Sequence, residues 1–156
     1  MSDTDDYLAI RRLQDRYADV ITRRAFDELH DLFLPDASIV VDMRSGGEPF
    51  RFDGPGALGE FLGPAMGRFG FFVFVILNAL VEVAPDGEVD GATGRMYISE
   101  LRTEGTDGPR VDSYGVYHDR YVRTAAGWRF ADRRYHSLGR LGPDGRSEVF
   151  PFPTDV

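Results

Sequence analysis

Apolar residues near the start of the chain recur at spacings of three and four residues. From residue 6 onward they fall on one face, as the 3.6-residue period of an α-helix requires, and they are Ile10, Leu13, Tyr17, Val20 and Ile21. The segment RRAFDELHDLFLPDA, residues 23–37, repeats this spacing and ends near Pro35, which cannot continue a helix. The pattern therefore predicts a helical hairpin at the front of the chain.

The rest of the chain is typical of β-structure. ASIVVDM, residues 37–43, is a short run with β-branched residues, and a short helix is expected through ALGEFLGPAM, residues 57–66. Turns with glycine or small residues separate four strand-length segments, which span residues 69–83, 90–104, 111–124 and 127–140. Helices followed by a meander predict an α+β fold, in which a curved antiparallel sheet wraps around the N-terminal helices.

The segment FGFFVFVILNALVEV, residues 69–83, is an almost unbroken apolar run. A strand with one face on the core should alternate apolar and polar residues, whereas Phe71 to Leu77 are apolar at every position. We therefore expect both faces to be covered, one by the interior and the other by a second subunit in a homodimer. A buried helix is the competing interpretation, but β-branched and aromatic enrichment and the turn at Pro85 favour a strand.

Length and composition limit the remaining options. The 156 residues predict one domain over residues 1–140, followed by a tail at 141–156 that serves as a lid or as an interface arm. The net charge of −8 argues against a nucleic-acid partner, which needs a basic face. An acidic start unlike a signal peptide, and the lack of an apolar stretch of membrane-spanning length, predict a cytoplasmic protein without a membrane partner.

The residue types also limit the chemistry. The absence of cysteine excludes disulfides, thiol catalysis and thiolate metal sites. Three scattered histidines offer no spacing for metal ligands, and the glycines form no phosphate-binding motif between a strand and a helix. We therefore expect neither a metal nor an organic cofactor.

Two stretches carry a resemblance to a known family. IRRLQDRYADVITRRAFDELHDLFLPDA at the start and YGVYHDRYVRTAAGWRF near the end, together with the order of elements, resemble the SnoaL-like branch of the nuclear-transport-factor-like superfamily. That superfamily includes polyketide cyclases, scytalone dehydratase and ketosteroid isomerase. The resemblance implies a conical, apolar cavity between the sheet and the first helix, suited to a small hydrophobic metabolite.

The resemblance also assigns positions to the catalytic groups of the dehydratases. Their helical Tyr matches Tyr17, and the later acidic position falls on Glu100. The Asp position falls on Thr22 and the His position on Phe74. Because elimination of water needs a base and an acid, and neither Thr22 nor Phe74 can supply one, the usual Asp-His pair is missing.

Three residues are candidates for catalysis, and each has a structural alternative. Tyr17 lies on the buried helix stripe and could donate to a substrate oxygen, or it is a core tyrosine. Glu100 shares strand parity with Met96 and Ile98, so it faces an apolar interior that would raise its pKa, or it is solvated. His136 shares parity with Phe130 and would point inward unless a bulge intervenes, as a catalytic or a structural residue.

Further residues are expected to bind the substrate. Phe72 and Phe74 would form its wall, and the candidates on the other elements are Thr22, Asn78, Ser113 and Tyr117. Asn78 could equally satisfy a backbone group within the sheet. Asp119 shares the face of Tyr117, but pairing with Arg133 on the neighbouring strand is the favoured interpretation.

These features predict a cofactor-independent enzyme that acts on a ring-bearing or polyketide-like metabolite by proton transfer. The reaction would be that of an isomerase, a cyclase or a lyase such as a dehydratase. The missing Asp-His pair keeps a second hypothesis open, a non-catalytic module that binds a hydrophobic ligand or serves in assembly.

Overall fold

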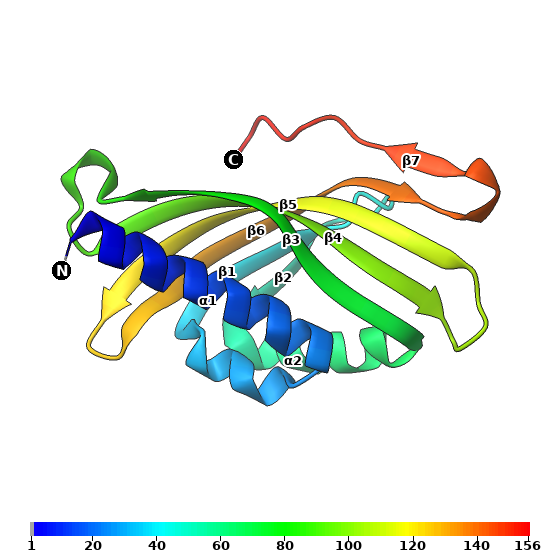
Figure 1. The fold of residues 1–156 in the computed structure, drawn as a ribbon, viewed down its shortest axis with the longest axis horizontal. Helices are drawn as coiled ribbons and strands as arrows, with labels where there is room; N and C mark the ends of the chain where they lie inside the picture. Colours follow the sequence, from blue (N-terminus) through cyan, green and yellow to red (C-terminus); the bar gives the residue numbers. More distant parts are fainter. Residues whose placement is uncertain (1) are drawn as a thin grey trace.

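A computed structural model describes residues 2–156, which form helices on one face of a single curved sheet (Figure 1). The helical segments are α1 (Asp3–Arg23), α2 (Gly54–Gly67) and the short 3-10 turns η1 (Phe26–Asp31), η2 (Pro85–Gly87) and η3 (Pro143–Gly145). The strands are β1 (Phe33–Asp42), β2 (Phe50–Asp53), β3 (Phe69–Val83), β4 (Gly91–Glu104), β5 (Arg110–Thr124), β6 (Gly127–Leu141) and β7 (Ser147–Val149). None of the described helices is long and apolar enough to cross a bilayer.

The strand order across the sheet is β2-β1-β6-β5-β4-β3, and β7 adds to β6. The long strands β3 to β6 form the predicted antiparallel meander. β1, however, pairs with β6 in parallel, so the sheet is mixed rather than wholly antiparallel. The hairpin of β1 and β2 adds to the β6 edge after η1 has reversed the chain. The α+β prediction, with a curved sheet over the N-terminal helix, is confirmed.

The predicted second helix of a front hairpin is wrong. Residues 26–31 form only a 3-10 turn, and Pro35 lies within β1 rather than after a helix. Pro35 is exposed between the paired residues Phe33 and Ser38, where the register with β6 is interrupted, so no ladder hydrogen bond is lost. Two of the regularly spaced apolar residues of this segment, Leu29 and Leu32, are nevertheless fully buried in the core.

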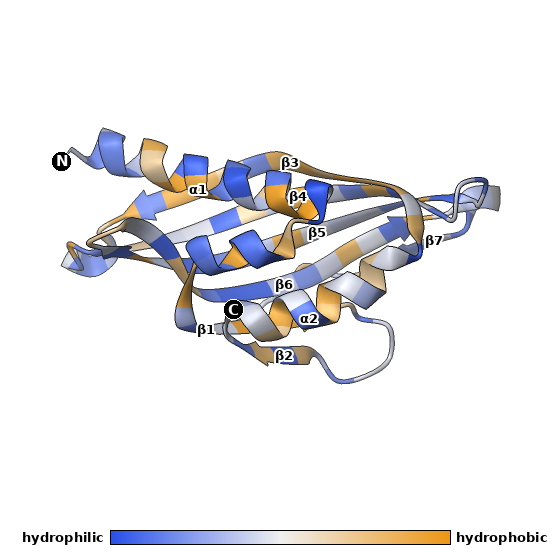
Figure 2. Cartoon of the chain, turned by 90° about the horizontal axis from the view of Figure 1, so that it is seen from below, coloured by the Kyte–Doolittle hydropathy of each residue, from blue (hydrophilic) through white to orange (hydrophobic). Residues whose placement is uncertain are grey.

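The apolar run at residues 69–83 forms β3, the edge strand beside β4. Its inner face contributes Phe72 and Phe74 to the core, as predicted. Its outer face leaves Phe71, Leu77 and Leu80 exposed by 44%, 56% and 52%. Figure 2 shows hydrophobic colour along most of this strand. The cover expected from a second subunit therefore stays a prediction.

The C-terminal tail runs along the outer face of the sheet, opposite α1 and α2 (Figure 1). β7 pairs antiparallel with the end of β6. Beyond β7, the Phe152 ring lies 6.4 Å from the Tyr97 ring and 5.9 Å from the His118 ring. These contacts place the tail on the side away from the concave face.

Helix α1 is fixed at its N-terminus by a buried carboxylate. A capping box between Ser2 and Asp5 starts the helix, and Asp6, only 2% exposed, receives two hydrogen bonds from Arg123 at 2.5 and 2.6 Å. Trp128 donates a further bond to Asp6 at 3.1 Å. The hydrogen bonds from Arg123 lower the pKa of Asp6. Asp6 is therefore a buried structural carboxylate, although it lies in an acidic stretch at the start of the chain.

A second buried ion pair crosses the centre of the sheet. Arg133 on β6 donates to both carboxylate oxygens of Asp119 on β5, at 2.7 and 2.8 Å, and the two side chains are 1% and 0% exposed. This confirms the predicted pairing of the two residues. Tyr121 donates to Asp119 at 2.9 Å and accepts from Gln14 of α1 at 2.8 Å, so the network connects the helix to the sheet.

Replacing Asp119 by alanine should destabilise the fold strongly, because it leaves the Arg133 guanidinium buried without a counter-ion. We expect Asp119→Ala to lower the free energy of unfolding by about 3–5 kcal/mol in urea titrations. The matched control is Asp112→Ala on the same strand, whose partner Arg110 is 58% exposed and whose loss should cost less than about 1 kcal/mol. Equal losses in the two variants would contradict this account of the pair.

Candidate active site

A cavity of about 270 Å³ lies between α1, α2 and the concave face of the sheet. Its wall is mostly apolar, with Ile21 from α1, Leu58, Phe61, Leu62 and Met66 from α2, Val41 and Phe50 from the β1-β2 hairpin, and Phe69, Phe72 and Phe74 from β3. Its volume is just below the range of about 300–1,000 Å³ typical of small-molecule sites. One ring-bearing molecule of modest size would fill it.

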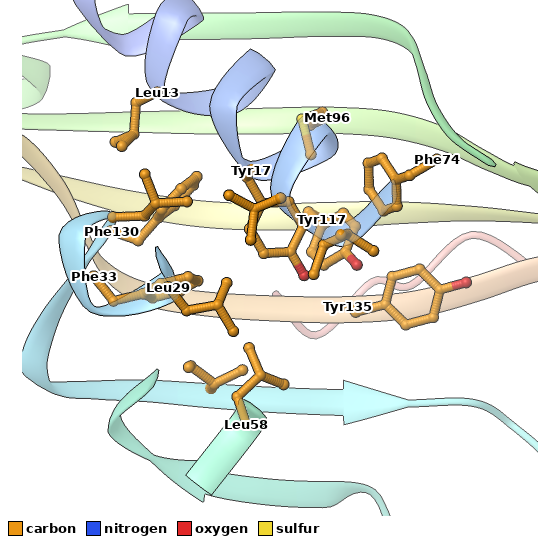
Figure 3. Close-up of a cluster of buried hydrophobic side chains, with 14 of the residues drawn as sticks. Leu13, Tyr17, Leu29, Phe33, Leu58, Phe74, Met96, Tyr117, Phe130 and Tyr135 are labelled. Atoms are coloured by element: carbon orange, nitrogen blue, oxygen red, sulfur yellow. The ribbon is translucent and has the colours of Figure 1, made fainter. Parts of the chain in front are cut away.

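The polar groups of the cavity come from α1 and three adjacent strands. They are Tyr17, Glu100, Arg102, Tyr117 and Tyr135, joined at the rim by Arg68. Figure 3 shows Tyr17, Phe74 and Tyr117 grouped together, with the Tyr135 ring beside Tyr117 and its hydroxyl directed away from Tyr17. Tyr117 and Tyr135 are partners in the β5-β6 ladder, and Phe74 and Glu100 are partners in the β3-β4 ladder, so each pair shares a face.

A glycine makes room for one of these tyrosines. A Cβ atom on Gly115 of β5 would lie 2.1 Å from a ring carbon of Tyr135, far inside van der Waals contact. Gly115 therefore lets the Tyr135 ring lie flat across the neighbouring strand, with only 3% of the residue exposed.

Tyr17 lies at the centre of an aromatic cluster and is 4% exposed. Its ring makes edge contacts with Phe74, Phe130 and Tyr117 at centroid distances of 5.6, 5.9 and 6.0 Å. The Arg133 guanidinium lies 4.1 Å from the Tyr17 ring centroid. Burial raises the pKa of the Tyr17 hydroxyl, while the Arg133 charge and the Tyr117 hydroxyl act in the opposite direction. Tyr17 is thus a neutral hydrogen-bond donor near neutral pH.

Glu100 presents a carboxyl group to the same cavity, with 20% of its side chain exposed. Arg102, two residues along β4, donates to one of its oxygens at 2.9 Å. Burial raises the pKa of Glu100, and the positive charges of Arg102 and Arg140 offset part of this effect. A carboxyl group with a raised pKa is a stronger base when ionised, so Glu100 can move a proton within the cavity.

Comparison with known proteins identifies the family. A family model described as the SnoaL-like domain matches residues 2–134. The chain belongs to the SnoaL-like domain family. An uncharacterized protein of Mycobacterium tuberculosis is 32% identical over 135 residues, which cover 85% of this chain and 86% of that protein.

Solved structures share the fold of this SnoaL-like domain. A hexachlorocyclohexane dehydrochlorinase, LinA-type3 from Novosphingobium barchaimii, is 19% identical with a TM-score of 0.76, over 96% of this chain and 100% of that one. A nuclear transport factor 2-like superfamily protein from Salmonella enterica is 17% identical with a TM-score of 0.72, over 87% and 93% of the two chains. The resemblance noted in the sequence is confirmed.

The SnoaL-like cavity brings together five of the residues predicted to form the site. These are Tyr17, Phe72, Phe74, Glu100 and Tyr117. Ser113 is the β5 partner of Glu100 and is 1% exposed, but it lies outside the cavity lining. Its hydroxyl has no hydrogen-bond partner among the residues described.

Thr22 and Asn78 also lie outside the lining. The Thr22 hydroxyl accepts a hydrogen bond from the backbone N–H of Phe74 at 3.0 Å, so it binds helix α1 to the edge strand. Asn78 follows a register shift between Ile76 and Asn78 in the pairing with β4 and is exposed. Neither residue lines the cavity, although both were candidates for binding the substrate.

The inward orientation expected for His136 is wrong, because a bulge intervenes. The register of β5 with β6 shifts between Arg120 and Tyr121, which leaves Ala131 as an extra residue on β6 and reverses the parity beyond it. His136 therefore lies on the outer face, where its ring centroid is 6.4 Å from that of His118. Burial lowers the pKa of both histidines.

Three polar residues of the cavity were missed in the sequence analysis, namely Arg68, Arg102 and Tyr135. Arg102 has the same strand parity as Glu100, and this local signal could have indicated it. Tyr135 shares the inner face with Tyr117, but only the cross-strand register reveals this because the bulge lies between Phe130 and Tyr135.

The described residues also form a larger groove of about 710 Å³ on the outer face. It is open to solvent and includes charged residues of both signs, among them Glu82, Arg95, Arg120, Asp132 and Arg134. No group of three or more His, Asp or Glu side chains within residues 2–156 is placed to hold a metal ion. The enclosed cavity is therefore the better candidate for chemistry.

The raised pKa of Glu100 has a measurable consequence. Because the folded state holds this proton more tightly than the unfolded state, ionising Glu100 weakens the fold as pH rises through its folded pKa. The change in the free energy of unfolding caused by Glu100→Gln should therefore be more stabilising, or less destabilising, at neutral pH than at acidic pH. Carboxyl-carbon NMR should show a pKa above the ordinary value, and a still higher one in Arg102→Gln, because Arg102 lowers it.

The matched control is Glu82→Gln, which changes an exposed glutamate on β3. Its effect on stability should not vary in this way with pH. A Glu100 pKa at or below the ordinary value, or one that falls in Arg102→Gln, would contradict the assignment.

Proposed function

We propose that this SnoaL-like domain is a cofactor-independent enzyme that moves a proton on a small, ring-bearing hydrophobic metabolite. Isomerisation, cyclisation and dehydration all fit this description. The observation that carries the proposal is the placement of the Glu100 carboxyl and the Tyr17 and Tyr117 side chains on one apolar cavity of about 270 Å³. An apolar wall with a few converging polar groups is the usual form of a small-molecule site.

The proposed step begins with the ionised Glu100 carboxylate. It removes a proton from a carbon next to a carbonyl group, and the electron pair of the broken C–H bond moves toward the carbonyl oxygen as an enolate forms. Tyr17 donates a hydrogen bond to that oxygen, where negative charge develops. Return of the proton from the now neutral Glu100 carboxyl group to another carbon gives an isomer. Alternatively, Glu100 gives this proton to a hydroxyl on the next carbon, the hydroxyl leaves as water and the enolate electron pair forms the new C=C bond of a dehydrated product.

Thr22 and Phe74, which stand at the positions of the dehydratase Asp-His pair, support the assignment of Glu100 as the base. Phe74 is 5% exposed and packs against Tyr17, and the Thr22 hydroxyl is bound to the β3 backbone. Neither residue can take a proton, and among the described residues that line the cavity Glu100 is the one carboxylate. The solved relative from N. barchaimii is a dehydrochlorinase by name, and loss of HCl also begins with removal of a proton from carbon.

Proton removal can be tested without knowing the natural substrate. The bicyclic ketone 2-tetralone has acidic C–H bonds beside its carbonyl, so an enzyme of this kind should exchange them with D₂O, as followed by mass spectrometry. We expect Glu100→Gln to slow the catalysed exchange about 10²–10⁴-fold, since it removes the base. Tyr17→Phe should slow it about 10²–10³-fold, since it removes a donor to the oxyanion.

Glu82→Gln and Tyr114→Phe are the matched controls, because neither residue lines the cavity. Both should exchange at the wild-type rate. If the wild-type protein binds 2-tetralone but exchanges no protons above the buffer rate, the proposal fails. That result would favour the second hypothesis, a module that binds a hydrophobic ligand without chemistry.

We also propose that the protein forms a homodimer through the outer face of β3. Leu77 and Leu80 are both more than half exposed there, and Phe71 is 44% exposed. Contiguous apolar side chains on a sheet face favour association with a second copy, because burial removes them from water.

A charge placed on this face should separate the subunits. We expect light scattering during gel filtration to give a dimer mass for the wild-type protein and a monomer mass for Leu80→Asp. Leu141→Asp is the control, because Leu141 is 47% exposed but lies at the end of β6. A monomeric wild-type protein, or a Leu80→Asp variant that stays dimeric, would contradict the proposal.

A further inference from the structure

The cavity of this acidic protein is lined by charged residues of both signs. The chain carries a net charge of −8, whereas the cavity is lined by two arginines, Arg68 and Arg102, and by one carboxylate, Glu100. The pKa values of Tyr17, Tyr117 and Tyr135 are all raised by burial, so these hydroxyls stay neutral. Glu104, which lies outside the lining, pairs with Arg68 at 3.5 Å, so Arg102 is the cation that the cavity itself encloses.

Arg102 is the cation best placed to meet a ligand. Its side chain is only 12% exposed, and its guanidinium is held by the hydrogen bond to Glu100 at 2.9 Å. It also lies over the Phe69 ring, 5.1 Å from the centroid. A guanidinium has five N–H donors, and among the described residues the bond to Glu100 is the one side-chain hydrogen bond recorded for Arg102. The remaining donors are available to a ligand.

Arg68 adds a second positive charge beside the same ring. Its guanidinium lies 4.8 Å from the Phe69 centroid, and its side chain is 63% exposed. Tyr17 is only 4% exposed, so exposure increases from the aromatic end of the cavity toward Arg68. Arg68 therefore lies at an exposed rim of the cavity, and the less exposed Arg102 lies further inside.

We propose that the ligand of this cavity is a ring-bearing carboxylate. Its ring lies against Phe72 and Phe74, and its carboxylate is bound by Arg102 inside the opening, with Arg68 adding long-range attraction. The planar guanidinium matches the two oxygens of a carboxylate, and a hydrogen bond between opposite charges is stronger than a neutral one. The inference names the substrate class of the proposed enzyme.

Two probes of nearly equal shape can test this. 1-Naphthoate carries a carboxylate, whereas 1-naphthamide is neutral, and calorimetric titration gives the affinity of each. At neutral pH and low salt we expect wild-type protein to bind 1-naphthoate about tenfold or more tightly than 1-naphthamide, which is the effect of one charge-assisted hydrogen bond. Arg102→Gln should remove this preference while leaving the affinity for 1-naphthamide nearly unchanged.

The matched control is Arg110→Gln, because Arg110 also pairs with a carboxylate two residues away but lies outside the cavity. It should keep the preference for 1-naphthoate, and Arg68→Gln should lose only part of it. Arg102→Lys keeps the charge without the planar group and should show an intermediate preference, which separates loss of recognition from loss of folding. Unfolding curves would verify that each variant is folded.

Two results would overturn the inference. One is a wild-type protein that binds 1-naphthamide as tightly as 1-naphthoate, and the other is a preference for 1-naphthoate that survives in folded Arg102→Gln. Loss of the carboxylate inference would leave the proposed function standing, because proton exchange on neutral 2-tetralone does not depend on a charge on the ligand. A passive pocket would still prefer 1-naphthoate but would exchange no protons.

Discussion

The site depends on the buried ion pair between Arg133 and Asp119. The guanidinium lies about equally close to the rings of Tyr17 and Tyr117, at 4.1 and 4.2 Å, so this one cation supports the tyrosines from α1 and from β5. Asp119 on the neighbouring strand accepts hydrogen bonds from two of the three guanidinium nitrogens, and Tyr121 connects Asp119 to Gln14 of the helix. A charge at this depth is stable only with such a partner, which fixes how the helix lies on the sheet.

That constraint separates the interior into two parts. The side chains of the ion pair are fully buried, and the cavity lies further along the concave face. At the aromatic end of the cavity Tyr17 is packed among neighbouring rings, whereas Glu100 and Arg102 are more exposed. A rigid donor at one end and a base in the wall are what proton transfer on a bound ring would need.

Much of the fold could be predicted from the sequence because its signals are local. Strand-length apolar runs and glycine turns indicated β3 to β6, and the helical stripe around Tyr17 indicated α1. The errors arose where structure depends on distant residues. Pro35 lies in a strand because the pairing with β6 is interrupted there, and His136 faces outward because of a bulge whose presence only the pairing with β5 reveals. Arg133 differs from a surface arginine only through its register with Asp119.

The central claim is that Tyr17 holds the oxygen of a ring-bearing ligand while Glu100 faces the carbon that exchanges its proton. A crystal structure with 2-naphthol, the aromatic analogue of the enol of 2-tetralone, tests this most directly. The account predicts that the naphthol oxygen lies about 2.5–3.0 Å from the Tyr17 hydroxyl, with the ring against Phe72 and Phe74. A naphthol bound outside the cavity, or with its oxygen directed away from Tyr17, would contradict it.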